Sequence, residues 1–362
     1  MQGTTVRPRS TPHPADPAPG SRPRSGRHAA PDDVDDPART QVHLPDLLDS
    51  AEPLLFDDED LQLPPPDPAA HGALRLPDGR ALAWGEYGSS RGLPCVLIPD
   101  RLSSRMAPGW LLHDTALPAT TRLLALDRPG IGASDPIGFG GTEQPAEDLR
   151  RLVETLAVGR VAVIGVGHGV GDALAFASRY PAMVVSVTAV SAGLPPQAEA
   201  RRGLRGLLSR GPRNHAGHLA GWVTAAGRDA DLTSFTVWER LVERLAADAR
   251  AELGDRWREV DFRRAVAADA AQQSGPWTVP AAPVDDPSWA QEARGVRAPV
   301  HLWLGQREAV LAAARLQAEA ADRPDWRVTR VAGTSALLSA WPEILADVTA
   351  SFQAAPDARP VS

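Results

Sequence analysis

The sequence contains no lysine, because all of its basic residues are arginine. It therefore has no side-chain amine for Schiff-base chemistry and cannot supply the phosphate-binding lysine of a P-loop. The single cysteine, Cys95, excludes an internal disulfide and a zinc site built from cysteines. One lone cysteine also suits a reducing compartment, and we expect a cytoplasmic protein.

Long apolar runs and an excess of positive charge are also missing. No apolar segment is long enough to span a bilayer, and the arginines near the N-terminus are not followed by the apolar stretch of a secretory signal. The formal net charge is −7 and the pI is about 5.7. We therefore expect neither nucleic acid nor a membrane surface among the partners.

Two terminal segments lack the pattern of a folded core. Residues 1–71 are rich in Pro, Asp, Arg, Ser and Gly without sustained apolar periodicity, which predicts a disordered tail. Within the tail, residues 44–56 place leucines among acidic residues, so one hypothesis is a short amphipathic helix that binds a protein partner. The alternative is a solvated tail with scattered leucines. Residues 355–362 are predicted to be a flexible C-terminus.

Short apolar strands alternate with helical segments after residue 72. We expect a hairpin around Pro77-Asp78-Gly79, strands at 93–99, 121–127, 160–165, 183–193, 298–305 and 325–333, and helices at 143–158, 168–179 and from Pro342. The alternation predicts an α/β core, formed by residues 72–193 and 294–354, with a mainly parallel central sheet and helices on both faces. Residues 194–293 show helical segments without a clear strand and are expected to form a helical cap insertion.

Two motifs resemble the α/β-hydrolase superfamily. Residues 124–136 (LALDRPGIGASDP) look like its strand and turn, and residues 160–181 (RVAVIGVGHGVGDALAFASRYP) look like its strand, nucleophile elbow and helix. The resemblance covers residues 73–352. It implies the α/β-hydrolase fold with a cap and, for a typical member, hydrolysis of an ester-like substrate.

The residues that carry the chemistry of this superfamily are changed here. The elbow pattern G-x-S-x-G reads G-V-G-H-G, which puts Gly167 at the nucleophile position. Residues 331–345 resemble the segment that carries the catalytic histidine, and the resemblance puts Thr334 at that position, although threonine is no general base near neutral pH. Residues 299–308 resemble the strand and turn that carry the acid, and the resemblance puts Glu308 there, with a carboxylate that has no imidazole to orient.

The loop that forms the oxyanion hole also departs from the resemblance. It reads Pro99-Asp100, and a carboxylate there opposes a developing oxyanion, while His168 stands after the nucleophile position. These joint changes predict a catalytically inactive pseudo-hydrolase. Its expected role is to bind a small apolar ligand between core and cap, or a protein partner.

A relocated active site is the main alternative. His168 and Asp172 lie four residues apart, on one face of a helix, and Asp100 is expected nearby. Such a group can do acid–base work or hold a metal with one further ligand, and with Glu308 it would make a hydrolase with a non-standard site. The simpler interpretation is that Asp172 stabilises the helix dipole and His168 fills space.

A dinucleotide site is a minor alternative, because the elbow also resembles a Rossmann turn. The sixth position of that fingerprint is Val170 instead of glycine, and the next strand ends in Val190-Ser191 without an acidic residue for the ribose. We expect no cofactor and no metal. The insertion carries four tryptophans that form its own core or line a ligand pocket, namely Trp222, Trp238, Trp257 and Trp277.

Overall fold

The structure, a computed structural model, describes residues 68–100, 103–137, 143–191, 222–223, 226, 230–245, 247–272, 288–305, 318, 320–321, 323–332 and 336–355. The predicted tail up to residue 67 lies outside this range. So do Glu308, Thr334 and Trp277.

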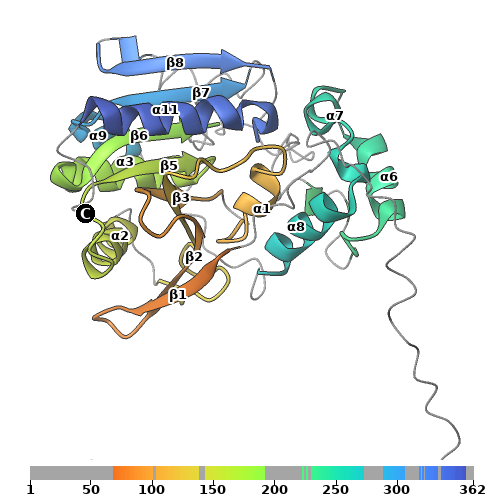
Figure 1. The fold of residues 1–362 in the computed structure, drawn as a ribbon, viewed down its shortest axis with the longest axis horizontal. Helices are drawn as coiled ribbons and strands as arrows, with labels where there is room; N and C mark the ends of the chain where they lie inside the picture. Colours follow the sequence, from red (N-terminus) through yellow and green to blue (C-terminus); the bar gives the residue numbers. More distant parts are fainter. Residues whose placement is uncertain are drawn as a thin grey trace, which may run out of the picture. The chain divides into compact units, whose positions relative to one another are not determined.

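The described residues form one eight-stranded sheet in the order β1-β2-β4-β3-β5-β6-β7-β8 (Figure 1). Its strands are β1 (Ala70–Arg75), β2 (Ala81–Gly88), β3 (Leu93–Ile98), β4 (Thr121–Leu126), β5 (Val161–Val166), β6 (Val184–Val190), β7 (Val300–Gly305) and β8 (Trp326–Val331). β2 pairs antiparallel with β1 and with β4, and all other neighbours are parallel. The predicted hairpin and the mainly parallel sheet are confirmed.

The central strands are buried on both faces, because every residue of β5, β6 and β7 is buried. Alternate side chains therefore enter two apolar clusters: Val96 and Ile98 of β3 join one, and Cys95 and Leu97 join the other. The first cluster includes side chains of α2 (Glu143–Thr155), α3 (Gly169–Arg179) and α9 (Ser288–Gly295). The second includes α1 (Pro108–Leu111) and α11 (Trp341–Ala354), which runs along the strands over β6 and β7 in Figure 1. Helices on both faces explain the continuous apolar strands.

The described part of the insertion is helical, with α6 (Phe235–Arg244), α7 (Ala247–Leu253) and α8 (Val260–Ala271) and no strand between residues 222 and 272. Trp222 contacts Trp238 and Phe262 at ring distances of 5.6 and 6.0 Å. These buried rings belong to the same apolar cluster as α11, so the described tryptophans pack as core.

Helix α9 begins at Ser288, within the range predicted for the cap, yet it packs on α3 beside the sheet. The helices of the insertion therefore end before α9. Among the described residues, none of the helices combines the length and the apolar character needed to cross a membrane.

The topology fixes where a site can form. β3, β4 and β5 are parallel neighbours, so the residues that follow them meet at one edge of the sheet. Asp100 follows β3, Arg128 follows β4, and Gly167 follows β5. Ligand sites of open α/β sheets lie at this carboxyl edge.

Candidate active site at the turn between β5 and α3

The turn between β5 and α3 has the sharp geometry of a nucleophile elbow. Gly167 has a φ of +56°, its N–H donates to the carbonyl of Val190 at 2.9 Å, and α3 begins two residues later. At Gly165, a Cβ would lie 2.7 Å from the Cα of Val170, so strand and helix approach too closely for a side chain there. The two features explain why glycine stands at both positions.

Asp100 occupies the space in which a nucleophile side chain would stand. A Cβ placed on Gly167 would lie 2.5 Å from Cγ of Asp100 and closer still to its Oδ1. Asp100 is itself buried, and its side chain is 11% exposed. The left-handed φ adds a cost of about 1–3 kcal/mol for any residue other than glycine. Glycine at position 167 is therefore matched to the Asp100 side chain as it stands.

The same carboxylate also takes the hydrogen-bond donor that this kind of elbow offers to substrate. The backbone N–H of the residue after the nucleophile normally forms half of the oxyanion hole. Here that residue is His168, and its N–H donates to Oδ1 of Asp100 at 2.8 Å. A fixed negative charge thus sits where a developing oxyanion would need a donor.

The imidazole of His168 bonds to the same oxygen. Its Nδ1 lies 2.7 Å from Oδ1 of Asp100, and the side chains are 27% and 11% exposed respectively. The carboxylate fixes the orientation of the ring, and no described residue is hydrogen-bonded to Nε2. Sequence reasoning placed His168 beside Asp100, and the structure brings the two together.

Asp172 does not join this pair. Its Oδ2 lies 3.0 Å from the guanidinium of Arg128, which follows β4. The position in the first turn of α3 also suits a carboxylate, because the helix dipole is positive there. Of the three residues proposed for a relocated site, His168 and Asp100 are hydrogen-bonded to each other, whereas Asp172 pairs with Arg128.

The DxPGxG turn after β4 is a scaffold for this edge. Asp127 accepts hydrogen bonds from the backbone N–H groups of Arg105 and Ala133, at 2.8 and 2.9 Å, and pairs with the Arg105 guanidinium. The Ser134 hydroxyl donates to the carbonyl of Asp127. This motif therefore holds loops in place, and its Arg128 pairs with Asp172 of α3.

A buried carboxylate in the insertion also binds the loop that carries Asp100. Asp269 of α8 accepts from the Ser104 N–H at 2.7 Å, from both hydroxyls of Ser103 and Ser104, and from the Trp110 indole at 2.8 Å. Burial raises the pKa of Asp269 to about 6, and these hydrogen bonds limit the rise. Sequence reasoning missed this residue. The available signal was its position on the apolar face of α8, three residues after Val266 and seven after Phe262.

The comparison with solved structures settles the fold. The chain is similar to a carboxylesterase from the ammonia-oxidizing thaumarchaeon Nitrososphaera gargenis, with a TM-score of 0.51 and 17% identity over 78% of this chain and 98% of that one. A thioesterase domain from the curacin biosynthetic pathway gives a TM-score of 0.53 and 16% identity, over 77% of this chain and 98% of the other. The chain has the α/β-hydrolase fold. At such identities the likeness extends to the α/β-hydrolase fold alone.

Sequence comparison adds one partial relative. Over 153 residues the chain is 31% identical to the dihydrolipoyllysine-residue acetyltransferase component of the acetoin cleaving system of Pseudomonas putida. The match covers 42% of this chain and only 37% of that protein, so the chain spans little more than a third of the relative's length. No protein-family model matches the sequence.

Proposed function

We propose that this chain is a non-hydrolysing protein with the α/β-hydrolase fold, and that its role is binding. The observation that carries the proposal is the Asp100 carboxylate inside the elbow. Gly167 supplies no nucleophile, and the N–H that would stabilise an oxyanion is donated to Asp100. The threonine at position 334, where the resemblance places the catalytic base, also supports the absence of hydrolysis.

The ligand that fits this proposal best is a small apolar molecule held between the sheet and the insertion. The ligand would lie against the apolar cluster that Val166, at the end of β5, shares with Trp222 and Phe262 of the insertion. Ligand sites of this kind are lined mainly by apolar and aromatic groups. Residues 44–56 remain our hypothesis for a protein partner.

The test combines binding with turnover on one compound. Because the apolar cluster contains Trp110 and Trp222, a bound short-chain alkyl ester such as ethyl hexanoate should change the tryptophan fluorescence saturably. Proton NMR of the same mixture should show no hexanoate beyond that formed with heat-treated protein. A fluorophosphonate probe should leave the intact mass unchanged. Steady ester cleavage, or a covalent adduct on any residue, would contradict the absence of hydrolysis, and a flat fluorescence titration would contradict apolar binding.

A second candidate function rests on the His168–Asp100 pair. A carboxylate bound to Nδ1 is the arrangement that orients a histidine as a general base, and Nε2 is then available to activate water. This would be a hydrolase without an acyl-enzyme intermediate. It predicts ester turnover that is abolished in His168→Gln while the protein still fails to react with the fluorophosphonate.

A further inference from the structure

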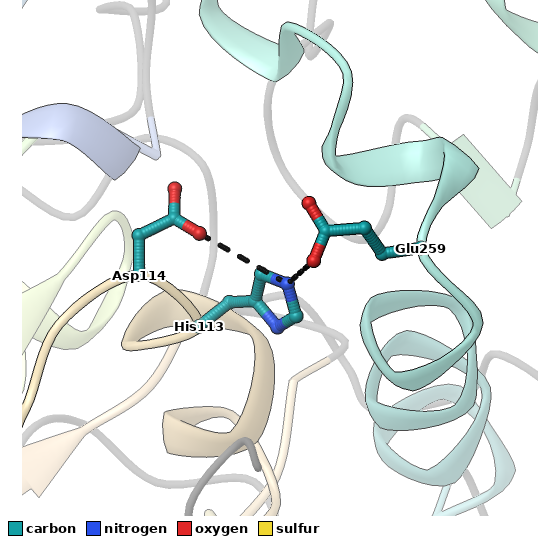
Figure 2. A group of neighbouring side chains, drawn as sticks. All are labelled: His113, Asp114 and Glu259. Atoms are coloured by element: carbon teal, nitrogen blue, oxygen red, sulfur yellow. Dashed lines mark hydrogen bonds and ion pairs between the residues drawn. The ribbon is translucent and has the colours of Figure 1, made fainter. Parts of the chain in front are cut away.

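Three side chains able to bind metals converge where the turn after α1 meets the start of α8. His113 and Asp114 follow α1, and Glu259 immediately precedes α8. One ligand atom from each lies within 4.8 Å of the others. In Figure 2 both carboxylates face the same ring nitrogen of His113.

The three ligand atoms lie close to the spacing that one small cation requires, with His113 and Glu259 now hydrogen-bonded to each other. Nε2 of His113 lies 2.7 Å from Oε2 of Glu259 and 3.9 Å from Oδ1 of Asp114. Two ligands of a tetrahedral Zn²⁺, each about 2.0–2.2 Å from the ion, are about 3.3 Å apart. Shifts of the two exposed carboxylates by about 1 Å would place all three atoms around one ion.

The imidazole is held firmly in this position. The His113 side chain is 7% exposed, and its ring meets that of Phe262 edge-on, at 5.2 Å and 76°. Its Nδ1 has no hydrogen-bond partner among the described residues. A ligating histidine usually donates its second N–H to an acceptor, so we expect weaker binding here than in sites that have one.

The two carboxylates are open to solvent, and one of them is oriented by an arginine. The side chains of Asp114 and Glu259 are 44% and 40% exposed, so an ion can reach them from solvent. The Arg256 guanidinium binds Oδ2 of Asp114, which leaves Oδ1 directed at His113. Such a contact to the far oxygen is how metal-ligating carboxylates are commonly oriented.

We propose that His113, Asp114 and Glu259 bind a divalent transition metal, with Zn²⁺ the best fit. An imidazole nitrogen favours Zn²⁺ over Ca²⁺ or Mg²⁺, which prefer sites made of oxygen alone. The ion ties the insertion, through Glu259, to the turn after α1 and keeps one position for water. The site stands independently of the function proposed for the elbow.

The experiment is a titration of the full-length, tag-free protein, stripped of metal by a chelator, with zinc chloride in a calorimeter. Wild type is expected to bind one Zn²⁺ at a site that Glu259→Gln and Asp114→Asn each weaken on the order of 10- to 100-fold. Zinc should also raise the melting temperature of wild type but not of Glu259→Gln, because the ion binds the folded state. The control is Asp261→Asn, an exposed carboxylate of α8 outside the group, which should behave as wild type.

Cobalt identifies the ligands, because Co²⁺ at a site of this kind absorbs visible light with an intensity that depends on its coordination. The band should disappear in Glu259→Gln and persist in Asp261→Asn. The chain has nine histidines, so weak zinc binding elsewhere would remain in every variant. Equal binding by wild type and Glu259→Gln, or no binding by wild type, would show that the group is an ion-pair cluster and overturn the proposal.

Discussion

At the scale of single residues, Gly167 and Asp100 are sterically coupled: a side chain at position 167 and the Asp100 carboxylate would occupy the same space. Gly167 has a backbone that disfavours side chains, and Asp100 fills the volume into which one would project. The first effect belongs to Gly167 alone, whereas the second exists only while Asp100 is present. The two contributions can therefore be separated by combining substitutions.

We predict that Gly167→Ser destabilises wild type more than it destabilises the Asp100→Gly variant. Only the backbone cost, about 1–3 kcal/mol, should remain once the carboxylate is gone. Urea unfolding of the four proteins gives the interaction free energy, which we expect to be at least about 1 kcal/mol.

Gly159→Ser is the matched control for this cycle. Gly159 also has a positive φ, +75°, but a Cβ there meets nothing within 4 Å. Gly159→Ser should lower the free energy of unfolding by the same amount in wild type and in Asp100→Gly. If the unfolding free-energy changes of Gly167→Ser and Asp100→Gly were simply additive, Asp100 would not be what fills the elbow.

We expect no esterase activity from Gly167→Ser with Asp100→Gly until Thr334→His is added, because a hydroxyl without a base stays unactivated.

At the scale of secondary-structure elements, Asp269 joins α8 to the loop after β3. Its four donors are two serine hydroxyls, one backbone N–H and one indole, so the described residues in contact with the carboxylate provide no cation. The carboxylate is therefore satisfied by neutral groups in a site that water does not reach, which is why burial dominates its pKa.

We predict that Asp269 makes the protein less stable as pH rises from about 4 to 7. Its pKa is about 6 in the folded protein and near 3.8 in the unfolded chain, so the folded state binds the proton more tightly. The stability from this group is complete below pH 3.8 and is lost as pH passes 6, a change of about 3 kcal/mol. Denaturant unfolding across this pH range should therefore show that the free energy of unfolding falls less with rising pH in Asp269→Asn than in wild type.

Asp261→Asn serves as the control, because Asp261 lies on the same helix but is exposed. Other groups titrate in this range, so the quantity to compare is the difference between each variant and wild type. Equal pH profiles for wild type and Asp269→Asn would show that the carboxylate keeps its ordinary pKa.

At the scale of the whole molecule, local patterns predicted the strands and the elbow. Of the long-range pairs, only Asp100 and His168 were expected to be close, from the resemblance. A strand buried on both faces is recognised from its own apolar run, without knowing which strands lie beside it. The turn glycines reflect local backbone geometry. By contrast, Ser104 and Asp269 are 165 positions apart, and His113 and Glu259 are 146 apart. Nothing in either local sequence specifies its partner. The same limit applied to Asp172, whose partner Arg128 stands 44 positions away.

We predict that removing residues 1–67 leaves the melting temperature nearly unchanged. That segment lacks the apolar pattern needed to join a core, and the sheet begins only at Ala70. Differential scanning calorimetry of the full-length and shortened chains makes the comparison. A decrease of many degrees would mean that the tail packs on the folded part, and replacing the leucines of residues 44–56 with serine would then locate the contact.

The steric conflict at the elbow also favours one order of substitution at positions 167 and 100. A chain that carries serine at position 167 has no room for the Asp100 carboxylate as it now stands, and a chain with Asp100 in place has no room for serine. A route of single substitutions toward the present pair is therefore easiest through glycine at 167 before aspartate at 100. A route toward serine at position 167 is correspondingly easiest when it begins at position 100, so its first step lies outside the elbow itself.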